Sequence, residues 1–293
     1  MKHQAIIYLF MGAVLCLTSC NKETQEPIAN EVKQPKRLIT AGGAITEVVN
    51  KLGFGDQIIA TDKTSTYPTH MQELPSIGYR NNITAEGLIS LNPDAIILEE
   101  GYLEPEIIQQ LEATGIELKQ INNEKTIAGA KQLITELASY LGAKSIGESL
   151  IKQIDVELEQ AQIQQQMSKE KPKVLFVYAR GHGTLNIGGT GTFAQEMVKL
   201  AGGELAVPEI EGYKPLTTEA LVKANPDYIL FFNSGLKTLN GVEGALEIPG
   251  IEQTTAGKQK NIIALDGLLL SGFDSRVGNA VLQLSQLIHP KES

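Results

Sequence analysis

Side chains that commonly act as nucleophiles or metal ligands are scarce in this sequence. Its two cysteines, Cys16 and Cys20, both lie within the first twenty of 293 residues. The histidines that follow them, His70, His182 and His289, are scattered and do not form the cluster that a zinc site needs. The sequence contains neither a Gly-x-Ser-x-Gly motif nor a phosphate-binding Gly-x-x-x-x-Gly-Lys-Ser/Thr motif. We therefore find no positive support for an enzyme.

A glycine-rich motif is the remaining candidate for cofactor chemistry. Residues 189–194 match Gly-x-Gly-x-x-Ala before a predicted helix, a pattern found in dinucleotide-binding turns. Residues 184–187, which precede the motif, make a poor strand. Export of the protein, indicated by its N-terminus, also argues against a nicotinamide enzyme. We interpret the motif as a glycine-rich turn that lines a cleft.

The N-terminus has the features of an exported lipoprotein. An apolar run over residues 5–17 is too short to span a membrane and fits the core of a signal peptide. It ends in Leu17-Thr18-Ser19-Cys20, which resembles the lipobox of bacterial lipoproteins. The resemblance implies that residues 1–19 are a signal peptide, that Cys20 is lipidated, and that residues 20–36 tether the folded body to a membrane. A simple signal peptide with an incidental cysteine is the alternative.

The composition excludes several classes of protein. Hydrophobic residues make up 42% and charged residues 20% of the chain, which is ordinary for a globular protein and excludes a disordered chain or a polytopic membrane protein. A formal net charge of −9 argues against a nucleic-acid binder. The length of 293 residues allows one large domain or two lobes.

Short apolar runs alternate with helical patterns along the body of the chain. They predict strands at residues 37–41, 57–61, 95–99, 116–121, 173–179, 227–232 and 261–266. Strands that alternate with helices predict βα units and parallel sheets. The sequence therefore predicts an α/β fold.

A long helix is predicted in the middle of this series. Apolar residues at Ile146, Leu150, Ile154 and Leu158 recur at helical spacing. A coiled-coil seam is the alternative, but the run is too short for one, and we favour a rigid connector. We expect two Rossmann-like lobes with parallel sheets, joined by this one helix. The predicted boundaries are residues 37–144 for the N-terminal lobe, 145–171 for the helix and 172–293 for the C-terminal lobe.

An internal repeat supports the division into two lobes. Residues 84–98 read TAEGLISLNPDAIIL and residues 217–231 read TTEALVKANPDYILF. Each copy predicts a short helix that ends near Asn-Pro-Asp and leads into a buried strand, because proline disfavours helix at the residue before it. We expect the two lobes to share this part of their topology.

Four segments of the N-terminal half together resemble one known family. They are RLITAGGAITE at residues 37–47, DKTSTYP at 62–68, LPSIGYR at 74–80 and AEGLISLNPD at 85–94. This series resembles the haem (hemin) receptors of bacterial ABC importers, substrate-binding lipoproteins of the helical-backbone (class III) type that includes the cobalamin receptors. The resemblance extends over most of residues 37–289. It implies a binding protein, not an enzyme, whose transported ligand is haem.

The resemblance assigns the iron ligand to Tyr79. In the family a tyrosine of a Leu-Pro-x-x-Gly-Tyr segment binds the ferric iron, and a phenolate oxygen is a hard donor that suits Fe(III). A nearby cation favours a phenolate. The family commonly places an arginine or lysine two residues after this tyrosine, but here that residue is Asn81, and Arg80 stands one residue after it. A loop tyrosine packed on the rim of the lobe is the alternative for Tyr79.

Further haem contacts are implied in both lobes. Arg180 and Arg276 are candidates for pairing with the propionates, since a guanidinium matches carboxylate geometry; a surface ion pair is the alternative for both. Arg80 is a candidate for contact with either the phenolate of Tyr79 or a propionate. Tyr67, on a predicted cleft loop, is the rival ligand; the alternative is that its Thr-Ser-x-Tyr-Pro stretch is a structural part of the cleft, as the family usually has it. His182 follows the fifth predicted strand, and some relatives carry an iron-binding histidine in this loop. It is either a sixth iron ligand or a solvated loop histidine.

The repeat also bears on the partners of the protein. Glu86 and Glu219 occupy matching places in its two copies. In this class of receptor one acidic residue of each lobe docks on the ABC permease dimer, which works with ATPase subunits, and two pseudo-symmetric acids suit such a partner. A glutamate favoured by the dipole at a helix start is the simpler explanation, and the two explanations are compatible. A cobalamin or ferric-siderophore receptor and, from another class, a secreted α/β enzyme are the alternative functions.

Overall fold

The computed structural model describes residues 35–166 and 170–290. Cys20, the predicted signal peptide and nearly all of the predicted tether lie outside the described residues. The described residues belong to one compact unit, Gln34–Ser293, that contains two β-sheets. No helix within the described ranges is both long and apolar enough to cross a membrane. We use N-terminal lobe and C-terminal lobe for the parts built on the first and the second sheet, and the predicted domain boundaries remain predictions.

The N-terminal lobe is built on a four-stranded sheet of order β2-β1-β3-β4, in which every pair is parallel. Its strands are β1 (Leu38–Ala41), β2 (Ile58–Thr61), β3 (Ala95–Glu99) and β4 (Glu117–Ile121). Its helices are α1 (Gly43–Val49), α2 (Ala85–Ser90), α3 (Pro105–Glu112) and α4 (Ile127–Tyr140). Leu38 and Ile97 face one hydrophobic cluster, and Ile39 and Ile96 face another. Burial of both faces explains why β1 and β3 are largely apolar runs.

The C-terminal lobe is built on a sheet of order β10-β9-β5-β6-β8, with the short β7 paired beside β5. Its strands are β5 (Lys173–Ala179), β6 (Leu185–Gly188), β7 (Glu204–Leu205), β8 (Tyr213–Pro215), β9 (Tyr228–Phe232) and β10 (Ile262–Leu265). Its helices are α6 (Phe193–Leu200), α7 (Thr218–Ala224), α8 (Asn233–Thr238), α9 (Gly241–Leu246), α10 (Thr255–Gln259), α11 (Gly267–Ser271) and α12 (Val277–Ile288). Phe176 and Phe231 are fully buried on the two faces of this sheet.

Two expectations about the C-terminal sheet need correction. The sheet is mixed and not wholly parallel, because β6 runs antiparallel to both β5 and β8. The run 184–187, judged a poor strand, lies largely within β6. A tight turn explains both findings: Gly181 has a φ of 75°, and the amide of Arg180 donates to the carbonyl of Thr184 at 2.9 Å. The chain therefore reverses directly after β5.

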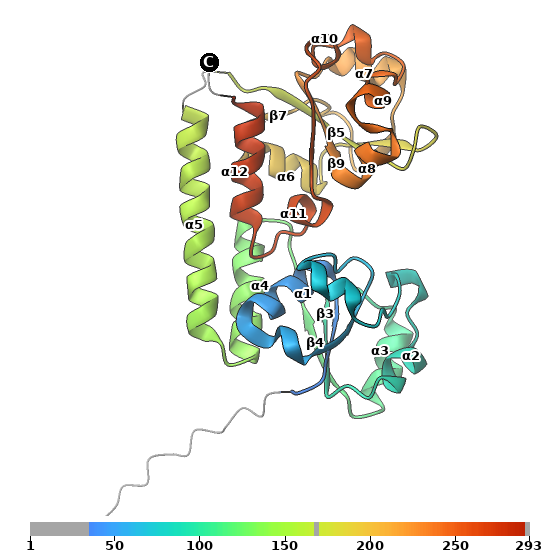
Figure 1. Ribbon diagram of the computed structural model, residues 1–293, viewed down its shortest axis with the longest axis vertical. Helices are drawn as coiled ribbons and strands as arrows, with labels where there is room; N and C mark the ends of the chain where they lie inside the picture. The colour runs from blue at the N-terminus through green and yellow to red at the C-terminus, as the bar shows by residue number, and fades with distance from the viewer. Residues whose placement is uncertain (1–34, 167–169, 291–293) are drawn as a thin grey trace, which may run out of the picture. The chain divides into compact units, whose positions relative to one another are not determined.

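The predicted connecting helix is α5 (Lys144–Gln166), which runs alongside α4 and α12 (Figure 1). The helices approach closely at two glycines. A Cβ on Gly147 would lie 2.5 Å from the Cβ of Ala138 in α4, and one on Gly278 of α12 would lie 2.8 Å from the carbonyl oxygen of Ile154. Because α4 belongs to the N-terminal lobe and α12 to the C-terminal lobe, α5 braces both.

The internal repeat folds twice in the same way. Thr84 and Thr217 cap α2 and α7, each accepting a hydrogen bond of 3.1 Å from the backbone amide three residues on. Asn92 and Asn225 adopt positive φ values, 50° and 39°. The next acidic residue in each copy then holds the start of the lobe's central strand, as the carboxylate of Asp227 accepts from the amide of Lys173 at 2.8 Å. The predicted helix and buried strand are confirmed in both copies.

Candidate functional site

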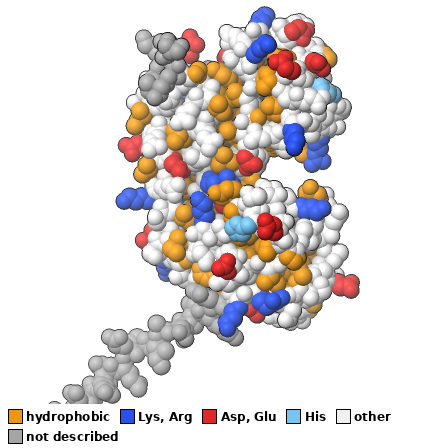
Figure 2. Space-filling model, viewed as in Figure 1, with side chains coloured by type: hydrophobic (Ala, Val, Ile, Leu, Met, Phe, Trp, Pro, Cys, Tyr) orange, Lys and Arg blue, Asp and Glu red, His pale blue; other side chains and the backbone are white. Residues whose placement is uncertain are grey.

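A cavity of about 620 Å³ opens between the two lobes. The N-terminal lobe contributes most of its lining and the C-terminal lobe contributes an arginine; the lining residues are Thr64, Tyr79, Arg80, Asn81, Asn82 and Arg180. Figure 2 shows the surface hollowed between the lobes, with lysine or arginine side chains on both edges. The volume falls within the range of small-molecule sites, about 300–1,000 Å³. The structure thus brings together three of the residues that the sequence singled out: Tyr79, Arg80 and Arg180.

Tyr79 presents its phenol to this cavity from a short loop. Its side chain is 57% exposed, although tyrosine is a residue that usually packs at least partly inside. Gly78 has a φ of 101°, a conformation that favours glycine, and its carbonyl accepts a hydrogen bond from the amide of Lys63 at 3.0 Å. The carbonyl of Tyr79 accepts from the amide of Asn82 at 2.7 Å. The backbone on both sides of Tyr79 is therefore fixed while its ring stays open to a ligand.

A buried carboxylate organises the loop that faces Tyr79. Asp62 is 3% exposed and accepts hydrogen bonds from the backbone amides of Gly42, at 3.0 Å, and Thr64, at 2.8 Å. The hydroxyls of Ser65, at 2.6 Å, and Tyr102, at 2.5 Å, donate to it as well. Burial, and then the negative charge of Asp62, raises the pKa of Tyr102 above its usual range, so its hydroxyl keeps its proton. Several donors satisfy the charge, which makes the loop rigid.

Arg80 lines the cavity but is held by its own lobe. Its guanidinium donates to the carbonyl of Gly101 and lies 5.5 Å from the centre of the Tyr102 ring. Tyr102 is 7% exposed and therefore packs inside the lobe. The predicted contact of Arg80 with a propionate stays a prediction, and its stem already lies at the cavity wall.

The C-terminal lobe places Arg180 and His182 in the turn between β5 and β6. The Nε of Arg180 donates to the hydroxyl of Tyr178 at 2.7 Å, which directs the guanidinium along the end of the sheet and into the cavity lining. His182 is exposed at the tip of the turn and does not belong to the residues that line the cavity. Iron binding by His182 remains a prediction.

Arg276 lies in a buried ion pair between the lobes. Its Nε donates to the carboxylate of Glu47 in α1 at 2.7 Å, and an Nη donates to the other carboxylate oxygen. Glu47 is fully buried and also accepts from the hydroxyl of Ser275 at 2.9 Å. The guanidinium stacks 3.7 Å from the centre of the Tyr67 ring. Arg276 and Tyr67 thus contact each other apart from the cavity lining, and their predicted haem contacts stay predictions.

A second buried acid completes this group. Asp274 is 1% exposed, and its Oδ1 accepts from the amide of Arg276 at 2.9 Å. Burial, and then the negative charge of Glu47, raises its pKa well above the usual range. The raised pKa favours the neutral form of Asp274, and in that form the single positive charge of Arg276 balances the single negative charge of Glu47. We call Glu47, Asp274, Ser275 and Arg276 the interlobe latch.

The two glutamates of the repeat are exposed. Glu86 and Glu219 each occupy the second position of a capped helix, α2 or α7. This is the place where the helix dipole favours an acid, so the simpler explanation holds for both. Their exposure also leaves them accessible to a partner, and docking on a permease remains a prediction.

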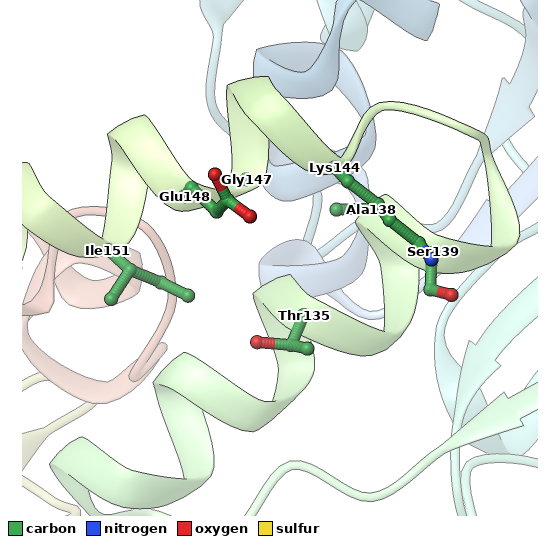
Figure 3. Close-up of a pocket in the computed structure, with 7 residues that line it drawn as sticks. All are labelled: Thr135, Ala138, Ser139, Lys144, Gly147, Glu148 and Ile151. Atoms are coloured by element: carbon green, nitrogen blue, oxygen red, sulfur yellow. The ribbon is translucent and has the colours of Figure 1, made fainter.

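A second hollow, of about 270 Å³, lies between α4 and α5 (Figure 3). Small polar groups such as Thr135 and Ser139 line it beside Lys144 and Glu148. It contains none of the predicted haem residues. In the part of the chain that the structure describes, no three histidine, cysteine or acidic side chains come together as a metal site.

A family model for periplasmic binding proteins matches residues 38–268 of this chain. The match covers both sheets and the helix between them, and the chain belongs to that family. By that description the members of the family are binding proteins. The α/β architecture predicted from the sequence is confirmed at this level.

Two solved structures of heme-binding proteins are similar to this chain. The structure is similar to the periplasmic heme-binding protein RhuT from Roseiflexus sp. RS-1 in its apo form, with 35% identity and a TM-score of 0.82 over 87% of this chain and 98% of that one. It is also similar to the heme-binding protein BhuT in complex with two hemes, with 31% identity and a TM-score of 0.80 over 87% and 98% of the two chains.

Two further proteins are similar to this chain in sequence. An uncharacterized ABC transporter substrate-binding lipoprotein, YvrC of Bacillus subtilis (strain 168), is 26% identical over 88% of this chain and 81% of its own length. A vitamin B12-binding protein of Photorhabdus laumondii is 28% identical over 58% of this chain and 60% of its own length. The predicted resemblance to substrate-binding proteins of ABC importers, and to haem-binding ones in particular, is confirmed.

Sequence reasoning missed some of the residues that shape the site. Lys63 and Asp62 stand in a segment that carried the resemblance, but nothing in their spacing indicated that they face Tyr79 or Tyr102. Glu47 lies 229 residues from its partner Arg276. A buried glutamate in an otherwise apolar helix was the available signal, since such an acid needs a partner.

Proposed function

We propose that this protein captures haem between its two lobes and delivers it to an ABC permease in the membrane. The observation that carries the proposal is the exposed phenol of Tyr79 in a cavity that also contains arginines from both lobes. Phenolate oxygen is a suitable ligand for Fe(III), and guanidinium groups suit the two propionates of haem. The heme-binding neighbours at 35% and 31% identity support the same ligand.

Delivery to a permease rests on separate features. Glu86 and Glu219 are exposed at matching places in the two lobes, and a pseudo-symmetric pair of acids suits a dimeric partner with basic patches. Lipidation of Cys20 after removal of residues 1–19 would keep the receptor at the membrane that holds the permease. The Bacillus relative is itself described as a lipoprotein, which supports the anchor.

A haem titration of the chain from residue 21 tests the ligand. We expect the wild type to give an iron–phenolate charge-transfer band and Tyr79→Phe to lose it. Haem affinity should fall at least about tenfold in this variant, since mutating even a residue that only hydrogen-bonds a metal ligand lowers metal affinity 10–100-fold. His182→Ala reports whether the turn after β5 supplies a sixth ligand. An unchanged hemin spectrum at micromolar protein would refute the proposal.

The pH dependence and a second ligand complete the test. Protons compete with iron for the phenolate, so haem affinity should fall between pH 8 and pH 5. A flat profile would count against tyrosine as the principal ligand. Cobalamin is the second candidate, because of the vitamin B12-binding relative. Tight cobalamin binding that survives Tyr79→Phe would favour it over haem.

A further inference from the structure

A lysine from a neighbouring loop lies over the ring of Tyr79. The Nζ of Lys63 is 5.3 Å from the centre of that ring. Lys63 precedes Tyr79 by 16 residues in the sequence, on the loop that follows β2, so no local spacing predicts the contact. A cation at this distance from an aromatic ring is attracted to its face, and it is attracted far more strongly once the ring carries a phenolate charge.

The position of Lys63 is fixed by the residues on either side of it. Its own amide donates to the carbonyl of Gly78 at 3.0 Å, which joins the two loops next to the tyrosine. Asp62 before it is buried and accepts from the amide of Gly42 at 3.0 Å, while the amide of Thr64 after it donates to the same carboxylate at 2.8 Å. The backbone of Lys63 is therefore anchored to the core of the lobe, although its side chain is exposed.

The two arginines that line the cavity already have hydrogen-bond partners. Arg80, the neighbour of Tyr79 in sequence, donates to the carbonyl of Gly101 and lies over the ring of Tyr102. Arg180 from the C-terminal lobe donates to the hydroxyl of Tyr178. Both therefore hold their guanidinium groups against other partners, and each can meet a carboxylate of a ligand without facing the phenol.

From this arrangement we infer that Lys63 is the positioning residue that stabilises the negative charge of Tyr79 when its oxygen binds ferric iron. The inference rests on the proposed function and assigns a role within it. Lys63 acts through Tyr79, whereas Arg80 forms part of the cavity wall. The cation that favours the phenolate thus comes from the loop after β2 and not from the residues that follow the tyrosine.

Spectra and affinities of Lys63 variants test the inference. A positive charge lowers the energy of the phenolate electrons, so Lys63→Gln should move the iron–phenolate band to longer wavelength and weaken haem binding about fourfold, the size of one charge contact about 5 Å away in a solvated site. Lys63→Arg should restore both. Lys258→Gln in α10 removes an exposed lysine away from the cavity and should change neither.

A double-mutant cycle separates this role from a general effect of charge on an anionic ligand. In a Tyr79→Phe background, Lys63→Gln should have no further effect on affinity. An unmoved band in Lys63→Gln, or the same loss of affinity with and without Tyr79, would overturn the inference while haem binding by the wild type still supported the proposed function. A wild type without the band, or indifferent to Tyr79→Phe, would overturn both.

Discussion

Replacing Glu47 by glutamine tests whether the interlobe latch holds the two lobes together. The substitution keeps the shape of the side chain and removes its charge. Arg276, whose side chain is 15% exposed, would then lose its ionic partner in a site where Glu47 itself is fully buried. Removing one partner of a buried ion pair leaves the other charge without compensation, which is the costly way to break it.

The size of the effect follows from this burial. Breaking such a pair costs about 3–5 kcal/mol, and the partial exposure of Arg276 places the value near the lower end, about 3 kcal/mol. For a body of this size that loss lowers the midpoint of thermal unfolding by about 8 °C. Asp274 reduces the loss, because without the negative charge of Glu47 beside it this acid can ionise and balance Arg276. Adding Asp274→Asn to Glu47→Gln should therefore destabilise the protein further.

Urea unfolding and thermal melts at pH 7 measure both variants. Asp155→Asn is the matched control, since Asp155 pairs with Lys131 on the exposed surfaces of α5 and α4. An exposed pair contributes at most about 1 kcal/mol. If Glu47→Gln costs no more than Asp155→Asn, or if the double variant is no less stable than Glu47→Gln, the reasoning about charge balance in the latch is wrong.

Two further variants test buried acids. Burial and Glu47 raise the pKa of Asp274, so the folded state binds a proton that the unfolded state releases; this stabilisation is complete below the unfolded pKa and is lost as the pH rises toward the folded pKa. The stability of Asp274→Asn relative to the wild type should therefore rise between pH 5 and pH 7, by up to about 1.4 kcal/mol per pH unit. Free energies of urea unfolding that change with pH in the same way for both proteins would contradict this. Tyr102→Phe removes one donor from Asp62 and should cost about 1.5 kcal/mol, whereas an unchanged urea midpoint would show that the remaining donors suffice.

Most of the strands that the sequence predicted are buried along much of their length, although the predicted edge strand β4 is largely exposed or half-buried. Runs such as 95–99 and 227–232 are continuously apolar because helices cover each side of the sheet. Strands β6 and β8 escaped prediction for the opposite reason. They lie toward the edge of the sheet, β8 is wholly exposed, and it ends in a proline. Such strands are short and polar, and pairing with β5, not their own pattern, makes them strands.

Of the candidate site, the sequence could name the residue that we propose binds the iron. Tyr79 could be named because a resemblance marked its segment. The use of Arg276 could not be predicted, because its partner Glu47 lies 229 residues away and the choice between a ligand and an ion pair is made by packing. The same holds for Lys63, whose approach to Tyr79 depends on a backbone hydrogen bond between two loops.

The two lobes share part of their topology but contribute unequally to the cavity. The repeat gives both lobes a threonine-capped helix, a left-handed asparagine and a buried strand. The cavity has no such symmetry, since five of its six lining residues belong to the N-terminal lobe and only Arg180 to the other. The latch and α5 tie the lobes together, and the amide of Gly181 donates to the hydroxyl of Thr238 at 2.8 Å, which holds the turn that carries Arg180 against α8. Under the proposed function, the N-terminal loops therefore supply the iron ligand, and Arg180 adds a contact from the C-terminal lobe.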